Sequence, residues 1–282
     1  KTQRKNNESS APRINLFEVR MVAKTIWYLL LQGYEPDQIL VLTPYLAQLR
    51  ELREATTQVD GSGSVSIDSS SRVRMATIGS YAGEKSDVVM CSFVRSKKGG
   101  DMGLVADPNR LNFAVSRVRH CLILFGDIDF YTSDTAQSES GRNLWLEFAA
   151  LLEAGGHVYR DGLPVVCEEH KTHADLPTPE AFDENAPGGG CGVVCGAILQ
   201  CGHPCPRRCH PGFDQPHDLT PCKAVLTDTC AKGHTSKLVC SRDGSGGPCQ
   251  PCKREESDAK QEVAVSSDES RHDAPVGEAP VG

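Results

Sequence analysis

Residues 39–52 read ILVLTPYLAQLREL. The first four of these residues are apolar without interruption, which is typical of a short strand buried on both faces of a parallel sheet. Leu46 to Leu52 continue as a helix. A buried strand that leads within a few residues into a helix is the repeating unit of α/β folds. This stretch therefore predicts the fold class of the chain around it.

The same alternation continues on both sides. Upstream, Asn15 and Glu18 have the spacing of a capping box, and apolar residues from Val19 to Leu30 recur at helical spacing. Downstream, we expect strands and helices in turn, the strands at 73–77, 88–94 and 121–125 and the helices at 111–118 and 144–152. The pattern predicts an α/β domain over residues 13–158, in which helices cover a mostly parallel sheet.

The second half of the chain has a different composition. Eleven of the 13 cysteines lie between Cys167 and Cys252, where Gly and Pro are frequent and histidines interleave with the cysteines. Such a segment cannot bury a large apolar core and needs other cross-links. A disulfide-rich secreted domain is the alternative, but the histidines and the odd cysteine total favour metal. We therefore expect a small, irregular, zinc-stabilised domain over residues 159–253.

Zinc is usually held by four tetrahedral thiolate or imidazole ligands, and ligands two to five residues apart can reach one ion. The candidate ligands are Cys167, His170, Cys191, Cys195, Cys201, His203, Cys205, Cys209, His210, His217, Cys222, Cys230, His234, Cys240, Cys249 and Cys252. At four ligands per ion, this set predicts three or four zinc ions.

The spacings also suggest how these ligands are divided. We expect one site to take the first four candidates, Cys167, His170, Cys191 and Cys195. Another site would combine Cys230 and His234 with two or three of the cysteines that follow. The ligands in the middle block would be shared between interleaved sites.

Residues 201–222 begin CGHPCPRRCH, the pattern Cys-x-His-x-Cys-x3-Cys-His, and a further His and Cys follow. This segment resembles the NFX-type zinc finger. The resemblance implies nucleic-acid or protein binding. Basic side chains are available for phosphate contacts, namely those of Arg207, Arg208, Lys223, Lys232, Lys237 and Arg242. A structural zinc scaffold with ordinary surface charges is the alternative interpretation.

Four segments of the first half also resemble a family when they are taken in order. They are Asn15-x-x-Glu18, Leu42-Thr-Pro-Tyr-x-x-Gln48, residues 77–96 and Arg110–Arg119. They resemble the second RecA-like domain of superfamily 1 RNA helicases of the Upf/Senataxin-like group, and the last two resemble motifs V and VI. Together with an NFX-type module, they resemble the NFX-type zinc-finger-containing helicases linked with small-RNA silencing.

This resemblance implies a C-terminal part of an ATP-dependent RNA helicase, whose second motor domain is present here. It implies that Arg117 is the arginine finger that neutralises charge on the γ-phosphate. The implied nucleotide contacts are Tyr45, Gln48, Gly83 and Arg95, and the implied RNA contacts are Thr43, Thr77 and Ser96. Zinc would be resident, whereas ATP and magnesium would bind only together with a first RecA-like domain.

The sequence also supports other hypotheses. It contains no G-x-x-x-x-G-K-[ST] segment, so we expect the chain alone to be inactive as an ATPase. Gly79, Ala82 and Lys85 stand where the family has Asp, Gln and Glu. The second hypothesis is therefore a non-catalytic RNA-binding scaffold that recruits silencing or surveillance proteins through its zinc fingers. A ubiquitin-ligase-like module is a third, but the last cluster lacks the eight-ligand RING pattern.

Charge and hydropathy narrow the class of protein. The formal net charge is −7, which argues against a surface that attracts nucleic acid everywhere. We expect the polar residues 1–12 and the acidic residues 254–282 to be disordered. No apolar run reaches the ~18 residues of a membrane span, and no apolar signal core is present. The expected protein is intracellular, nuclear or cytoplasmic rather than secreted, with RNA and not a membrane as partner.

Overall fold

The computed structural model describes residues 13–57, 73–96, 100–134, 138–210, 217, 220–240, 249 and 251–254. The predicted lead-in at 1–12, the Gly/Ser-rich stretch at 60–72 and the acidic tail after Arg254 lie outside the described residues. Two compact units are present and are treated separately below. The first comprises residues 1–193 and 208–214, and the second comprises residues 194–207 and 215–282.

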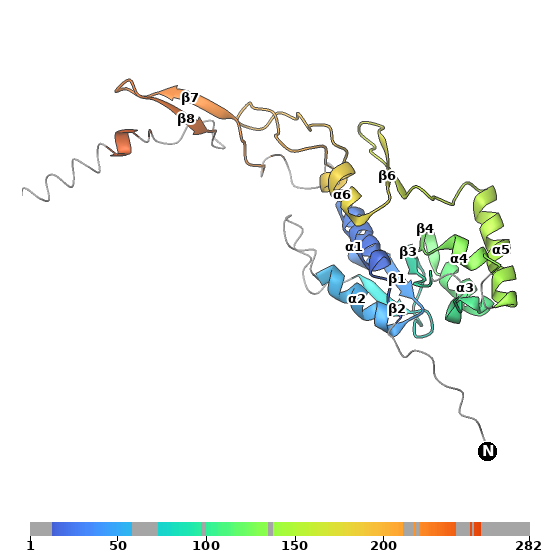
Figure 1. Cartoon of the computed structure of the whole chain (residues 1–282). Helices are drawn as coiled ribbons and strands as arrows, with labels where there is room; N and C mark the ends of the chain where they lie inside the picture. Colours follow the sequence, from blue (N-terminus) through green and yellow to red (C-terminus); the bar gives the residue numbers. More distant parts are fainter. Residues whose placement is uncertain are drawn as a thin grey trace, which may run out of the picture. The chain divides into compact units, whose positions relative to one another are not determined.

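A parallel sheet forms the centre of the first unit (Figure 1). Its four strands, counted over the described residues, are β1 (Ile39–Thr43), β2 (Arg74–Thr77), β3 (Ser86–Ser92) and β4 (Val118–Phe125). They are arranged in the order β2-β1-β3-β4, and every pairing between them is parallel. The predicted parallel α/β architecture is confirmed.

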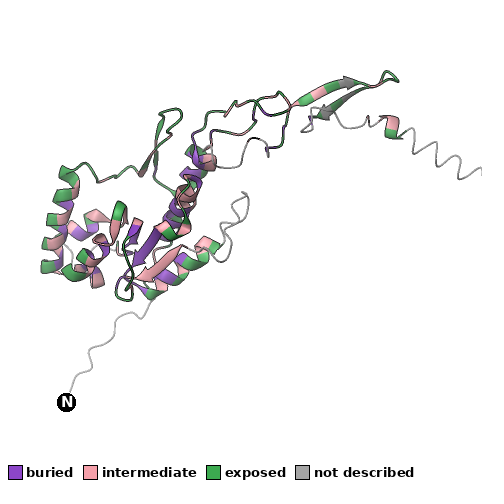
Figure 2. Cartoon of the chain, turned by 180° about the vertical axis from the view of Figure 1, so that it is seen from behind, coloured by how far each residue is buried: buried purple, intermediate pink, exposed green. Residues whose placement is uncertain are grey.

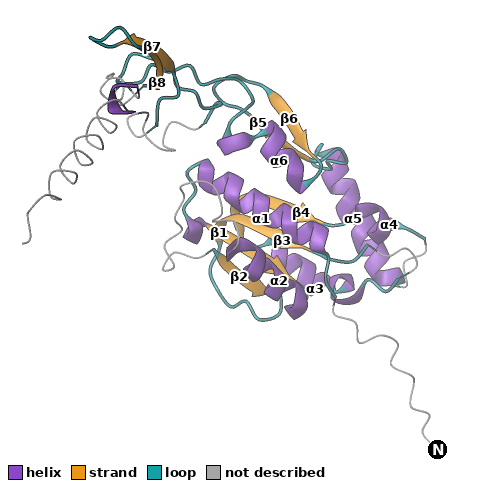
Figure 3. Cartoon of the chain, turned by 60° about the vertical axis from the view of Figure 1, so that its left-hand side comes forward, coloured by secondary structure: helices purple, strands orange, loops and turns teal. Residues whose placement is uncertain are grey.

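The helices complete this architecture (Figure 3). The α-helices are α1 (Leu16–Leu31), α2 (Leu46–Thr57), α3 (Pro108–Val115), α4 (Ile128–Thr132), α5 (Glu139–Ala154) and α6 (Pro179–Asn185). Short 3-10 turns are η1 (Pro36–Gln38), η3 (Gly103–Ala106) and η4 (Pro187–Gly189). Among the described helices, none has the combined length and apolar character that crossing a bilayer requires.

Successive side chains of a strand point to opposite faces of a sheet, and both faces are covered here. Ile39 and Val41 pack with α1 and α2, whereas Leu40 and Leu42 pack with α3, α4 and α5. Every residue of β1 is buried, and buried residues are purple in Figure 2. Truncation of a fully buried leucine such as Leu42 to alanine costs about 2–5 kcal/mol, so these contacts dominate the stability of the unit.

The boundaries of α3 differ from the predicted range of 111–118. Asp107 caps the helix at its start and a proline occupies the first turn, an arrangement that favours an early start. The helix ends at Val115, because Val118 already pairs in β4. Arg119, in the last of the helicase-like segments, therefore lies in a strand.

The chain that follows the predicted boundary at residue 158 packs on α1. The hairpin of β5 (Leu163–Val166) and β6 (His173–Leu176) and the helix α6 bury Leu176 and Phe182 against Met21. The ring of Phe182 also contacts Tyr28 edge-on, with 6.3 Å between the centroids. Two exposed ion pairs join α1 to α6, but such pairs contribute at most about 1 kcal/mol each, so the apolar contact holds the segment. The boundary at 158 stays a prediction.

The first turn of α1 confirms the predicted cap at Asn15 and changes the role of Glu18. In a capping box, Glu18 would accept from the backbone N–H of Asn15, but that N–H donates to Gln48 Oε1 at 2.9 Å. Glu18 is instead 4% exposed. Its carboxylate accepts from the Ser92 hydroxyl at 2.6 Å and from the Val94 backbone N–H at 3.0 Å. Burial raises the pKa of Glu18 to about 7, although these hydrogen bonds oppose the rise.

We expect Glu18→Gln to remove a pH dependence from the stability of the first unit. The folded pKa of Glu18, about 7, lies above its ordinary value of 4.5. The folded state therefore binds the proton more tightly, and this contribution to stability is present below pH ~4.5 and is lost as the pH rises through ~7. Between pH 6 and pH 8 the loss is roughly 1 kcal/mol.

Urea unfolding of wild type and Glu18→Gln at these two pH values measures the effect. The difference in unfolding free energy between the two proteins should change with pH by roughly that amount. A difference that is the same at both values would contradict the prediction.

The second unit has a small core of a different kind. Its hairpin consists of β7 (Val225–Thr229) and β8 (Thr235–Val239), which pair antiparallel. The buried cluster contains one aliphatic side chain, Leu199, and three cysteines, Cys205, Cys222 and Cys240. Because thiols outnumber hydrocarbon side chains in this cluster, hydrophobic burial alone supplies little stability here.

Candidate metal centres and ligand-facing sheet edges

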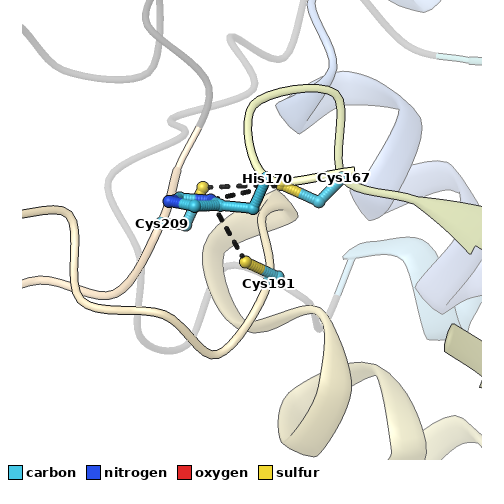
Figure 4. A group of neighbouring side chains, drawn as sticks. All are labelled: Cys167, His170, Cys191 and Cys209. Atoms are coloured by element: carbon cyan, nitrogen blue, oxygen red, sulfur yellow. Dashed lines mark hydrogen bonds between the residues drawn. The ribbon is translucent and has the colours of Figure 1, made fainter. Parts of the chain in front are cut away.

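Four of the predicted ligands converge in the first unit (Figure 4). The ligand atoms of Cys167, His170, Cys191 and Cys209 all lie within 4.8 Å of one another. Cys167 Sγ is 3.7 Å from both Cys209 Sγ and His170 Nδ1, and Cys191 Sγ is 3.4 Å from His170 Nδ1. The four side chains point toward a common centre.

Local backbone geometry brings these ligands together. Cys167 and His170 belong to the turn between β5 and β6, where Lys171 has a φ of 54° and donates its N–H to the Cys167 carbonyl at 2.7 Å. Gly190 precedes the third ligand, and a β-carbon at Gly190 would overlap the backbone carbonyl of Cys209. The close approach of these two chain segments therefore requires glycine.

The separations fit a tetrahedral zinc ion. Bonds of about 2.3 Å to sulfur and about 2.0 Å to imidazole nitrogen place two sulfurs about 3.8 Å apart and a sulfur and a nitrogen about 3.5 Å apart. The observed separations are 3.7 Å between sulfurs and 3.4–3.7 Å between sulfur and nitrogen. A disulfide would need about 2.0 Å, and no disulfide joins any of the thirteen cysteines, all of which are described.

The acidity of the clustered thiols also suits a cation. Burial acts to raise the pKa of Cys167, but hydrogen bonds with the backbone and ring of His170 outweigh it, and the pKa falls to about 6. Burial and the hydrogen bond with Cys167 raise the pKa of Cys209 to about 12. One thiolate is thus favoured at the expense of its neighbour, whereas a divalent cation between them stabilises both thiolates.

Two more complete groups lie among the described residues of the second unit. They are Cys201, His203, Cys222 and Cys240, and Cys230, His234, Cys249 and Cys252. In the latter, Cys252 Sγ lies 3.5 Å from both Cys230 Sγ and His234 Nδ1. Both sets combine three thiols with one imidazole, which is an ordinary donor set for structural zinc.

Cys195, Cys205 and His217 of the second unit also converge, with Cys195 Sγ 3.2 Å from His217 Nε2. His210, the one candidate ligand not yet described, is half-buried and directly follows Cys209. All the other candidates therefore lie in groups that have the donor atoms and spacing for a metal ion.

The grouping of the side chains differs from the predicted division at one position. Cys209, and not Cys195, completes the group of Cys167, because residues 208–214 belong to the first unit and Cys195 belongs to the second. Cys201 and Cys205 belong to different groups, as interleaved sites would require. Cys240 does not join Cys230, which the prediction had left open.

The carboxyl ends of the strands gather several residues with predicted ligand contacts. Thr43 and Thr77 end β1 and β2 and lie opposite each other in register. The Thr43 hydroxyl is buried and makes no hydrogen bond within the described part of the chain. Beyond it, two guanidinium groups lie near the ring of Tyr45, those of Arg13 and Arg95, at 5.3 Å and 5.5 Å from its centroid. Positive charge beside an aromatic ring suits phosphates and bases.

Two other predicted contacts at this edge differ in accessibility. Gln48 is fully buried, and its amide group bonds within the chain. Its Nε2 donates to the Asn15 carbonyl and the Ser92 hydroxyl, and its Oε1 accepts from the Asn15 N–H. In this conformation Gln48 connects α1 to the sheet, and its nucleotide contact stays a prediction. Ser96 is exposed.

Arg117 lies at the opposite edge of the sheet, whereas Gly83 belongs to the loop that leads from β2 to β3. Arg117 precedes β4, and its carbonyl accepts from the N–H of Ser86, the first residue of β3, at 2.9 Å. Its guanidinium lies 4.4 Å from the ring centroid of Phe113, and its buried Nε makes no hydrogen bond to a described residue. Strands rise about 3.3 Å per residue, so roughly 20 Å separates the two edges. Arg117 is therefore distant from Tyr45 and Arg95.

Two residues near Tyr45 were not predicted as part of a site. Arg13 adjoins the segment expected to be disordered. Its positive charge was the only feature of the sequence that could have suggested a role in binding. Asp101 Oδ2 lies 3.7 Å from Arg95 Nη2, and it comes from a loop without a recognisable pattern. Their proximity to Tyr45 depends on the fold.

Comparison with known proteins agrees with both the parallel sheet and the Cys/His groups. A family model described as an AAA domain matches residues 1–129, which include the whole parallel sheet. The NFX1-type zinc finger-containing protein 1 of Homo sapiens is 30% identical over 243 residues, and that of Mus musculus is 29% identical over the same number. Each match covers 85% of this chain and 11% of the relative.

The chain is related to the NFX-type zinc-finger-containing helicases. The relation extends over both units, since a match over 85% of the chain must include most of the cysteines. The protein named helicase required for RNAi-mediated heterochromatin assembly 1, of Schizosaccharomyces pombe, is 35% identical over 123 residues, which is 43% of this chain and 12% of that protein. The chain spans about a tenth of the length of these NFX-type and helicase relatives.

Pairs of cysteine substitutions should show which ligands bind the same zinc ion. Cys191→Ser combined with Cys209→Ser removes two ligands of one group and should cost one zinc ion. Cys191→Ser combined with Cys195→Ser affects two groups and should cost two. Native mass spectrometry in the presence of a competing chelator counts the ions.

His173→Ala is the matched control, because His173 is exposed beside the first group but contributes no ligand to it. It should retain the wild-type zinc count. If the pair with Cys195 loses one ion and the pair with Cys209 loses two, the division read from the structure is wrong.

Proposed function

We propose that this chain is the second motor domain and zinc module of an ATP-dependent RNA helicase that acts in RNA silencing or RNA surveillance. The observation that carries the proposal is the combination, in one chain, of a parallel α/β unit of helicase type with Cys/His groups of zinc spacing. The names of its relatives include NFX1-type zinc fingers, an RNAi helicase and regulators of nonsense transcripts.

ATP hydrolysis would need a partner domain. A first RecA-like domain supplies the P-loop and the magnesium ligands in such motors, and this chain supplies the closing surface. Arg117 is the proposed arginine finger, since its buried Nε has no hydrogen-bond partner among the described residues. Gly83, in the exposed loop between β2 and β3, is a proposed nucleotide contact. Tyr45, Gln48 and Arg95 are the other proposed nucleotide contacts, and because they lie at the opposite edge of the sheet, they would contact a different part of the nucleotide from Arg117.

RNA would bind at the carboxyl ends of the strands. Thr43, Thr77 and Ser96 are the proposed contacts, and the first two already lie side by side in register. Parallel sheets commonly bind ligands at this edge. The zinc fingers would add a second surface, for RNA or for silencing and surveillance proteins.

The module would hold four zinc ions. Three groups have four ligands each within one unit, and Cys195, Cys205 and His217 are the proposed ligands of the fourth ion. Thiolates that must stay reduced to bind metal suit a reducing compartment, so the proposed location is the nucleus or the cytoplasm.

A non-catalytic RNA-binding scaffold is the second candidate function. The observation that favours it is the loop between β2 and β3, where Gly79, Ala82 and Lys85 are all exposed and replace the acidic and amide residues that the helicase resemblance implies. Lys85 reverses the charge at its position. A loop altered in this way could close over RNA without coupling to ATP hydrolysis.

Arg117→Ala in the full-length protein separates the two functions. If Arg117 is an arginine finger, RNA-stimulated ATP hydrolysis should fall by about 10³-fold, while RNA affinity without nucleotide should change little. The measurement is steady-state ATP hydrolysis at saturating RNA.

Arg119→Ala is the control for charge. Arg119 is exposed in β4 and bonds to Asp87 at 3.2 Å, so its loss should leave the rate within a factor of a few. A wild-type protein that binds RNA but hydrolyses no ATP would establish the scaffold instead.

A further inference from the structure

A strained turn follows β3. Val94 has a φ of 75° and is one of two described residues other than glycine with a positive φ. The backbone N–H of Arg95 donates to the carbonyl of Phe93 at 2.9 Å, which closes a γ-turn around Val94. This conformation is rare, and β-branched side chains disfavour it. Surrounding groups must therefore hold it.

Both backbone groups of Val94 are held by the first turn of α1. The N–H of Val94 donates to the two carboxylate oxygens of Glu18, at 3.0 Å and 3.2 Å. The carbonyl of Val94 accepts from Asn15 Nδ2 at 3.3 Å. Glu18 also accepts from the Ser92 hydroxyl at 2.6 Å. Asn15 is fixed in turn by two hydrogen bonds between its backbone and the Gln48 amide.

The chemistry of this arrangement requires an acceptor at Glu18. Three donors converge on the carboxylate, from Ser92, Val94 and Asn15. Above pH ~7 Glu18 is mainly ionised, and an ionised carboxylate has only acceptor atoms and satisfies all of them. A helix cap alone would need the side chain of Asn15 and would not require a buried acid.

The turn determines where the next side chain points. Arg95 Nε donates to the Tyr45 hydroxyl at 3.0 Å, and its guanidinium lies 5.5 Å from the ring centroid of Tyr45. Arg95 Nη2 is buried and makes no hydrogen bond within the described residues. Gly103 lies so close that a β-carbon there would overlap the Tyr45 hydroxyl. The guanidinium therefore has little room for another orientation.

We propose that Glu18 is a positioning residue, which with Asn15 holds Val94 in the left-handed turn and thereby aims Arg95 at Tyr45. The effect on orientation is a property of this chain. The effect on ATP hydrolysis rests on the proposed function, in which Arg95 contacts nucleotide. Asn15 and Glu18 thus connect the start of α1 to the ligand-facing side chain of Arg95. Arg95 lies 77 residues after Glu18 in the sequence.

The orientation of Arg95 can be measured without any activity. In the zinc-loaded 282-residue chain, the Nε–H of Arg95 bonds to Tyr45 and should exchange slowly with water by NMR. Glu18→Ala should speed this exchange at least tenfold. Adding Val94→Gly should restore slow exchange, because glycine adopts a positive φ without the clamp. Glu54→Ala, at an exposed acid of α2, should have no effect.

A folded Glu18→Ala chain with unchanged Arg95 exchange would overturn the proposal, as would a folded double variant that stays fast. Should Glu18→Ala fail to fold, Glu18→Gln provides the second test. It keeps one acceptor oxygen but loses the other, so exchange should rise severalfold, and an unchanged rate would again overturn the proposal.

Activity of the full-length protein gives the second readout. Glu18→Ala and Arg95→Ala should lower RNA-stimulated ATP hydrolysis by similar factors, and the double variant should lose no more than either one. If Arg95→Ala lowers the rate and Glu18→Ala does not, the positioning role is refuted. If Arg95→Ala has no effect, the nucleotide contact in the proposed function fails, and the NMR measurement still decides the role of Glu18.

Discussion

Burial of the two central strands on both faces is the constraint on which the first unit depends. Apolar side chains on β1 and β3 require cover above and below the sheet, so α1 and α2 pack on one face and α3, α4 and α5 pack on the other. A covered sheet leaves its two ends as the places where polar side chains meet solvent. Thr77 and Arg95 are presented at one end for this reason, and Thr43 ends its strand there with its side chain buried.

The helix α1 has a second role that follows from this packing. Its inner side covers the sheet, and its outer side carries Met21 and Tyr28, against which α6 and the β5–β6 hairpin pack. This contact fixes the turn that holds Cys167 and His170. The first metal group is therefore built on hydrophobic packing against the α/β unit, although its ligands are of the same kind as those of the second unit.

Cohesion in the second unit comes from different chemistry. Its buried cluster consists mainly of thiols, and thiols without a cation hold their protons unequally. The pKa of Cys230 falls to about 6, with burial outweighed by hydrogen bonds, while a hydrogen bond to Cys230 and burial raise the pKa of Cys252 to about 12. A divalent cation stabilises both neighbouring thiols as thiolates, so metal binding and folding are coupled here.

The sequence alone determined the order of strands and helices, the change from an apolar core to a metal-rich segment, and the set of candidate ligands. These features can be predicted because they depend on hydrophobic periodicity and residue type within short segments of the chain. Only the tertiary structure decided that Cys209 joins Cys167, that Glu18 supports Val94 rather than its own helix, and that Arg117 and Arg95 lie at opposite ends of the sheet. Each of these depends on which distant segments meet, and that is set by packing of the whole unit, which spacing along the chain does not encode.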